Sequence, residues 1–159
     1  MVLMFSGCTQ TEKAPAVTST TLSAQGGLDA KEIAALNQAL DDEYKARATY
    51  RKVLEKFGDV RPFSNIVGAE ENHISELKVL FDNYGLSVPA DEWPSKAPSF
   101  DTLEEACNGA AQAEIDNAAL YDRLLADVSH DDVKSTFEEL RDASRNNHLP
   151  AFQRCAERR

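Results

Sequence analysis

The chain has little basic charge, no long apolar run and no pattern typical of a sheet. Lys and Arg number 17 against 27 Asp and Glu, and the resulting net charge of −10 argues against nucleic acid or an anionic membrane surface as a partner. No apolar stretch reaches the roughly 18 residues that suggest a transmembrane helix. No alternation of apolar and polar residues marks a strand. What remains is helical periodicity, in a chain of 159 residues that is long enough for one domain with a real core.

Apolar residues recur at helical spacing in four stretches, and each stretch starts at a residue that favours a helix N-terminus. These start signals are Asp29 with Glu32, Pro62, Asp101 with Glu104, and Ser129 with Asp132. Gly58 and Gly85 end the first two helices. We therefore predict an all-α domain over residues 29–157.

Two of the three connections are short, about four residues each, so the first two helices and the last two each form an antiparallel hairpin. The Pro- and Ser-rich stretch 86–100 can extend to about 50 Å and run the length of the domain. The prediction is a four-helix bundle of two antiparallel hairpins joined by a long crossover. Trp93 in the crossover is expected to cover the flank, and Pro150 to bend the last helix just past His148.

Two parts of the chain repeat each other and carry polar residues where helices need apolar ones. The shared pattern is a Glu, an Ala and a Tyr at one spacing, followed by a His: Glu43, Ala48, Tyr50 and His73, then Glu114, Ala119, Tyr121 and His148. Each Glu and His falls in phase with an apolar stripe. Glu70, three residues before His73, lies on the same helical face.

Burying several carboxylates without compensation would cost several kcal/mol per charge, and a divalent cation removes that cost. Carboxylate with imidazole is a ligand set for non-haem Fe, Mn or Zn. We predict one or two ions, iron first with Mn or Zn as alternatives, held by Glu43, Glu70, His73, Glu114 and His148. The competing interpretation is a set of solvated glutamates and hydrogen-bonded core histidines.

With these residues the chain resembles the ferritin-like, di-iron carboxylate superfamily in its rubrerythrin-type form, over residues 29–157. That superfamily supplies a Glu from each of two helices and a Glu-x-x-His from each of the other two. Glu43 and Glu114 match the single glutamates, and Glu70 with His73 matches one Glu-x-x-His. The stretches 61–66 and 144–152 look more narrowly like a bacterial ferritin-like family with no assigned function.

The second Glu-x-x-His is incomplete, because Arg145 stands where the resemblance implies a sixth ligand, three residues before His148. In one interpretation Arg145 points to solvent and leaves five protein ligands and a water. In the other, its guanidinium takes the place of the second metal and pairs with Glu114. The sequence leaves both open.

Tyr50 and Tyr121 lie two turns beyond the single glutamates. We interpret them as core aromatics with satisfied hydroxyl groups; hydrogen bonding to the ligands, or electron transfer, is the alternative role. His130 is expected to be exposed. Several acids flank the ligands but lie off the apolar stripe and are predicted to be solvated: Asp41, Asp42, Glu71, Glu105 and Asp116.

Cys107 lies seven residues before Glu114, and Cys155 lies seven after His148. Because the third and fourth helices should be antiparallel, both cysteines fall at one height on the same seam. We predict a disulfide between them, with two buried thiols as the alternative. A disulfide fits an exported protein.

Residues 1–28 are predicted to form a lipobox-like N-terminus and a flexible tether. Residues 1–7 are largely apolar and Cys8 follows a small residue, which resembles the lipobox of bacterial lipoproteins. Residues 9–27 are rich in Thr, Ser and Ala. We predict a protein of the cell envelope, lipid-anchored through Cys8 or periplasmic. The short segment before Cys8 lacks a basic start, so a cytoplasmic chain is the alternative.

The resemblance implies an oxidoreductase that acts on peroxide, dioxygen or Fe(II). No rubredoxin-like Cys-x-x-Cys is present to deliver electrons. Two alternatives therefore stay open: a metal-binding or metal-sensing module without turnover, and a structural envelope lipoprotein that has lost the metal. Bundles of this kind often pair through a flat helical face, so a homodimer is compatible with the sequence.

Overall fold

The computed structural model describes residues 27–158, and the predicted lipidation site Cys8 with most of the tether lies outside them. Residues 27–158 contain helices and no strand, as the all-α prediction requires. The α-helices are α1 (Ala30–Phe57), α2 (Phe63–Asn83), α3 (Leu103–Leu124), α4 (Asp131–Ala143) and α5 (Leu149–Ala156). Over the same residues, no helix combines the length and the hydropathy that a membrane crossing requires.

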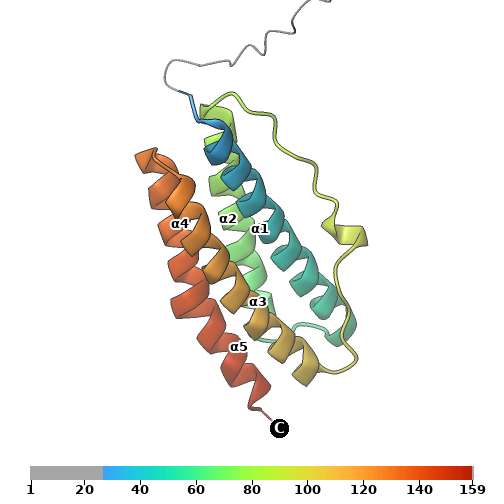
Figure 1. The fold of residues 1–159 in the computed structure, drawn as a ribbon. Helices are drawn as coiled ribbons and strands as arrows, with labels where there is room; N and C mark the ends of the chain where they lie inside the picture. Colours follow the sequence, from blue (N-terminus) through green and yellow to red (C-terminus); the bar gives the residue numbers. More distant parts are fainter. Residues whose placement is uncertain (1–26, 159) are drawn as a thin grey trace, which may run out of the picture.

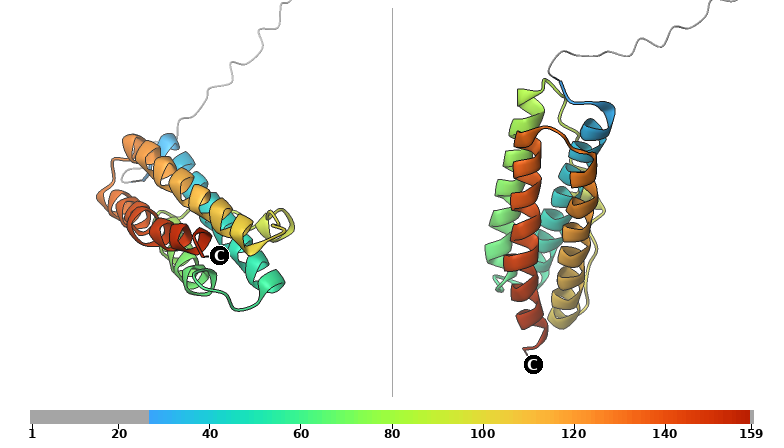
Figure 2. Two further views of the ribbon diagram at one scale, coloured as in Figure 1. Left: turned by 90° about the horizontal axis from the view of Figure 1, so that it is seen from below. Right: turned by 60° about the vertical axis from the view of Figure 1, so that its left-hand side comes forward.

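The helices lie side by side along one common direction (Figure 1). α1 and α2 run antiparallel to each other and are in direct contact. α3 runs antiparallel to α4 and α5, which follow one another as one rod (Figure 2). The connection from α2 to α3 passes along the outside for the length of the molecule, with a short 3₁₀ turn at Trp93–Ser95.

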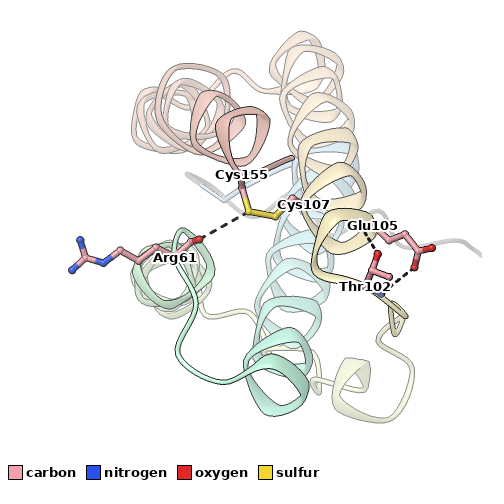
Figure 3. The surroundings of a disulfide bond; sticks show 5 residues. All are labelled: Arg61, Thr102, Glu105, Cys107 and Cys155. Atoms are coloured by element: carbon pink, nitrogen blue, oxygen red, sulfur yellow. Dashed lines mark hydrogen bonds between the residues drawn. A yellow bond between two sulfur atoms is a disulfide. The ribbon is translucent and has the colours of Figure 1, made fainter. Parts of the chain in front are cut away.

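α1 begins at the start signal expected from the sequence, where Asp29 and Glu32 form a capping box. α3 also begins with a capping box, but one residue later than predicted: Thr102 with Glu105 instead of Asp101 with Glu104 (Figure 3). The Thr102 hydroxyl accepts the backbone N–H of Glu105 at 3.1 Å, and the Glu105 carboxylate accepts the Thr102 N–H at 3.3 Å. Because Glu104 and Glu105 are adjacent, the sequence allows a capping box with either Asp101 or Thr102 as the N-cap residue. Thr102 has the extended backbone that an N-cap residue needs.

The start predicted for α4, Ser129 with Asp132, lies one residue before the observed N-cap residue, His130. The helix begins at Asp131, and its N-cap residue His130 makes no side-chain capping bond. Ser129 instead donates from its backbone N–H and its hydroxyl to the buried carboxylate of Glu32, at 2.7 and 2.8 Å. The Ser129 hydroxyl therefore donates to a carboxylate from α1 and does not accept a capping hydrogen bond from α4.

The last helix is interrupted by a π-helical turn at Ser144–His148, immediately before the point past His148 where the sequence predicted a bend. The N–H of Leu149 donates to the carbonyl of Ser144, five residues back instead of four. Pro150 follows in the first turn of α5. In a regular helix its ring would clash with the carbonyl four residues earlier. The wide turn lies immediately before that point.

Two apolar clusters fill the interior, one toward each end of the helices. The first joins the start of α1 and the end of α2 to α4, and the second joins the end of α1 and the start of α2 to α5. Trp93 packs against the first cluster and donates its indole N–H to Asp41 at 2.8 Å, which covers the flank as expected. Between the clusters, at the middle of the helices, lies a layer of buried polar residues.

Candidate metal centre

The middle layer brings together all five residues that the sequence singled out as ligands. They come from four helical segments, and each is buried: Glu43 on α1, Glu70 and His73 on α2, Glu114 on α3, and His148 at the end of the π turn. Their side chains are surrounded by apolar packing above and below, so solvent neutralises little of their charge.

Glu70 stands at the centre of this group. Its Oε2 lies 3.0 Å from Nδ1 of His73, and its Oε1 lies 3.2 Å from Nδ1 of His148. Each histidine also faces a second carboxylate: His73 faces Glu43 at 3.2 Å, and His148 faces Glu114 at 3.5 Å. The result is two groups of three potential ligand atoms, each within 4.8 Å of one another, that share Glu70.

Two atoms at this centre have no hydrogen-bond partner: Oε1 of Glu70 and Nδ1 of His148. They lie close together but are not aligned for a hydrogen bond. A buried polar atom without a partner costs about 1–3 kcal/mol, and more when the group is charged. A cation that accepts an electron pair from both atoms would satisfy them, so the residues present fit a metal ion.

The charges of the five residues depend strongly on one another. Burial raises the pKa of Glu43, and the nearby charge of Glu70 raises it further. Burial would lower the pKa of His73, but the carboxylates of Glu43 and Glu70 outweigh it and raise the pKa to about 10. The pKa of His148 is raised to about 9 in the same way, against burial, by Glu114 and Glu70. Positive charge is therefore favoured at both histidine positions.

The two tyrosines of the repeat are buried, and each donates to the glutamate of the other copy. The Tyr50 hydroxyl donates to Oε1 of Glu114 at 2.6 Å, and the Tyr121 hydroxyl donates to Oε1 of Glu43 at 2.8 Å. The sequence left two roles open for the tyrosines: core aromatics with satisfied hydroxyl groups, or hydrogen bonding to the candidate ligands. In the structure one set of hydrogen bonds fulfils both roles. Each bond occupies one oxygen and leaves Oε2 turned toward a histidine.

Asn117, which the sequence did not single out, is also buried beside the centre. Its amide group donates to Glu43 at 3.2 Å and to Asp42 at 2.9 Å, and its carbonyl oxygen accepts the Ser144 hydroxyl at 2.7 Å. The signal was available, because Asn117 follows Glu114 by three residues and so shares its helical face.

The expectation that Asp42 would be solvated is wrong. Asp42 is half-buried, and burial raises the pKa of its carboxyl group although Asn117 donates to it. The other flanking acids, Asp41, Glu71, Glu105 and Asp116, are exposed as predicted. His130 was expected to be exposed, but it is half-buried with Nδ1 at 2.8 Å from Glu32.

Arg145 points away from the centre and pairs with Asp122 on the surface at 2.7 Å. Its side chain is 46% exposed and makes no ion pair with Glu114, so the structure follows the first of the two interpretations. The π turn explains this direction. In a turn of more than four residues, the position that shares a face with His148 is four residues back, and Ser144 occupies it.

Cys107 on α3 and Cys155 on α5 form a disulfide in the structure, with their Cα atoms 5.6 Å apart (Figure 3). Both lie in the second apolar cluster, together with Phe63 and Phe152. The bond joins the helix that carries Glu114 to the segment that follows His148. It therefore helps to hold these two candidate ligands at one height.

Comparison with known proteins identifies a solved structure of similar fold but gives no activity. The chain matches no protein-family model, and no curated protein matches it. Among solved structures it is similar to the hypothetical protein MJ0754 from Methanococcus jannaschii, with a TM-score of 0.73 and 21% sequence identity. The match covers 93% of this chain and 85% of the other. At this level of identity, the likeness shows that the two chains share a fold.

Proposed function

We propose that the protein is a ferritin-like, rubrerythrin-type metal protein that holds one or two ions, iron in the first instance, between two antiparallel helical hairpins. The observation that carries the proposal is Glu70, which turns one oxygen toward each of two buried histidines. Two of these atoms have no partner among the described residues, 27–158. The direction of the helices and the long crossover agree with the resemblance in the sequence.

The five residues divide naturally between two positions. Glu43 and His73 would hold one ion, Glu114 and His148 would hold the other, and Glu70 would contact both. A bound iron ion would supply the redox chemistry toward peroxide, dioxygen or Fe(II). Tyr50 and Tyr121 orient the two outer carboxylates, and the apolar clusters exclude water from both ends of the site.

Elemental analysis of tag-free protein from iron-replete cells tests the proposal. We expect one or two irons per chain, or the same number of Mn or Zn ions. The absence of bound metal even after anaerobic loading with Fe(II) would contradict it. In that case the carboxylates and histidines would form a purely structural ion-pair network, and the structural envelope protein would be the better interpretation.

A pair of neighbouring variants makes this measurement specific. Glu70→Gln removes the charge shared by both positions and should abolish most metal binding. Glu71→Gln changes the next residue, which is exposed and pairs with Arg51 at 2.6 Å, and should retain the metal content of the wild type. Equal metal content in both variants would show that Glu70 is not a ligand.

Binding without turnover is the second candidate function. It is favoured by the outward direction of Arg145, which leaves five protein ligands where the superfamily that the sequence resembles has six. Iron-dependent consumption of peroxide separates the two candidates. Turnover that disappears in Glu70→Gln supports an oxidoreductase, whereas tight metal binding with no consumption supports a binding or sensing role.

The disulfide supports a location outside the reducing cytoplasm. We therefore retain the proposal of an envelope protein, anchored to the membrane by lipid at Cys8. Fractionation of cells that express the wild type or Cys8→Ala tests it: the wild type should sediment with membranes and the variant should be released. We also propose that the protein forms a homodimer, which sedimentation of the purified protein would test.

A further inference from the structure

A cavity of about 310 Å³ lies between α1 and α3, under the end of the crossover. Its inner wall includes Tyr50, Glu70 and Glu114, so it reaches two of the candidate ligands and a tyrosine that holds one of them. Apolar side chains from three segments line much of the rest, among them Ala46 and Phe100. The metal ligands do not fill this space, and the function proposed above gives it no role.

The outer wall is held in place by specific contacts. Lys52 donates to the backbone carbonyl of Ala97 at 2.8 Å, and Lys56 donates to the carbonyl of Phe100. The Phe100 ring lies against Gly109 of α3, where a Cβ would come within 2.6 Å of the ring. A glycine inside a helix is destabilising relative to alanine. At position 109 the missing Cβ leaves room for the Phe100 ring, which closes one side of the cavity.

The size of the cavity exceeds what the small oxidants need. A volume of 310 Å³ corresponds to about ten water molecules in the liquid, whereas peroxide and dioxygen have two heavy atoms each. An apolar cavity of about 150 Å³ in an engineered protein accommodates benzene. The volume here is roughly twice as large and lies at the lower end of the range for small-molecule sites. It suits a bicyclic organic molecule.

The charges around the cavity select against an anion. Four carboxylates line it, and Lys45 is the one basic residue among its lining residues. Lys45 already lies 3.8 Å from Asp42. A ligand with its own carboxylate would be repelled and would lose hydration on entering an apolar space. A neutral molecule avoids both costs.

We propose that this cavity binds a neutral, mainly apolar organic molecule of bicyclic size and places it beside Glu70 and Glu114. Its role as a substrate site of the metal centre rests on the function proposed above. Binding itself does not, because the cavity is formed by protein side chains. The ligand class therefore differs from the peroxide, dioxygen or Fe(II) that the resemblance implies.

Indole, a neutral bicyclic molecule, is the probe. Titration of the full chain, followed by amide chemical shifts in two-dimensional NMR, should show saturable changes at residues around the cavity such as Ala46 and Ala113. The experiment is done first on metal-free protein, so that a failure of the metal proposal does not affect it. Indole-3-carboxylate, which adds one negative charge to the same rings, should bind at least about tenfold more weakly.

Three variants locate the site. Ala113→Phe places a large ring in the cavity and should weaken indole binding by at least about tenfold, whereas Ala119→Phe adds the same ring on the exposed side of α3 and should leave it unchanged. Phe100→Ala, which removes one wall, provides a second test if Ala113→Phe does not fold. It should also weaken binding.

Three results would overturn the proposal. The first is the absence of saturable shifts around the cavity in both metal-free and metal-loaded protein. The second is indole binding that is unchanged in Ala113→Phe or, where that variant does not fold, in Phe100→Ala. The third is equal affinity for indole-3-carboxylate, which would contradict the selection for a neutral ligand. Metal content, measured separately, reports on the metal centre alone.

Discussion

Tyr50 and Tyr121 show how single residues connect the two halves of the repeat. Each hydroxyl donates to the glutamate of the opposite copy, across the interior of the molecule. Burial raises the pKa of each tyrosine strongly, and the charge of the glutamate that it faces raises it further. Both hydroxyls therefore stay protonated, and they act as donors that fix one oxygen of each carboxylate.

Removing one of these donors should weaken metal binding. Tyr121→Phe deletes the 2.8 Å bond to Glu43 and should lower metal affinity about 10- to 100-fold, the usual effect of losing a group that orients a ligand. Tyr44→Phe is the matched control, because the hydroxyl of this buried tyrosine makes only a long 3.5 Å contact to Pro89. Competition with a metal-binding dye measures both affinities. Equal loss in the two variants would contradict a specific role for Tyr121.

Arg145 provides a second prediction at this scale. Because its guanidinium pairs with Asp122 on the surface, Arg145→Ala should leave the number of bound metal ions unchanged. The exposed ion pair is worth at most about 1 kcal/mol, so stability should hardly change either. Elemental analysis and urea unfolding check the two statements. A second ion that appears only in the variant would show that Arg145 blocks a metal position in solution.

At the scale of secondary structure, the π turn at Ser144–His148 sets the composition of the site. It rotates the chain so that Ser144 and His148, not Arg145 and His148, share the buried face. Ser144 then donates to Asn117, which in turn donates to Glu43. The wide turn thus places a neutral hydrogen-bond network on the buried face and Arg145 on the surface.

The disulfide between α3 and α5 should contribute much of the stability of this half of the molecule. It closes a loop with a sequence separation of 48 residues. For a loop of that length the chain-entropy model gives about 4 kcal/mol of stabilisation. Urea unfolding with and without a reductant should show a loss of that order, and Cys107→Ala with Cys155→Ala should reproduce it without reductant. A Cys8→Ala variant serves as the control and should respond like the wild type.

At the scale of the whole molecule, Glu32 joins the start of α1 to the connection between α3 and α4. Its buried carboxylate accepts the backbone N–H groups of Asp29, Ser129 and His130. The His130 ring also lies against it at 2.8 Å. Although burial opposes it, these contacts lower the pKa of Glu32 far below its ordinary 4.5, while the carboxylate raises the pKa of His130 above its ordinary 6.5.

The contact between Glu32 and His130 makes the free energy of unfolding depend on pH in both the acidic and the alkaline range. The contribution of His130 is complete below its ordinary pKa of 6.5 and is lost as the pH rises through the raised value. The contribution of Glu32 is complete above its ordinary pKa of 4.5 and is lost as the pH falls. The stability difference between the wild type and His130→Ala should therefore be largest between these two values and shrink at alkaline pH. Urea unfolding across pH measures it, and a constant difference would contradict the assignment.

Much of the candidate site was visible in the sequence because its signals are local. Glu43, Glu70, His73 and Glu114 fall in phase with apolar stripes, and all are buried in the structure. Asn117 also falls in phase with the apolar stripe of its helix. The sequence did not single it out, because a neutral asparagine can be buried at a lower cost than a charged glutamate and so gives a weaker signal. Asp42 lies one residue off the stripe, and in the structure it is half-buried and accepts a hydrogen bond from the amide of Asn117 on another helix.

The sequence by itself determined where helices form, which face of each is apolar and which polar residues interrupt that face, because helical periodicity depends only on neighbours along the chain. The tertiary structure decided the partners of those residues. The direction of Arg145 depends on the width of one turn. The hydrogen bonds of Ser129 before α4 depend on a carboxylate from α1. The cavity beside Glu114 depends on how Phe100 packs against Gly109. These features arise from contacts between segments far apart in sequence, which no local pattern encodes.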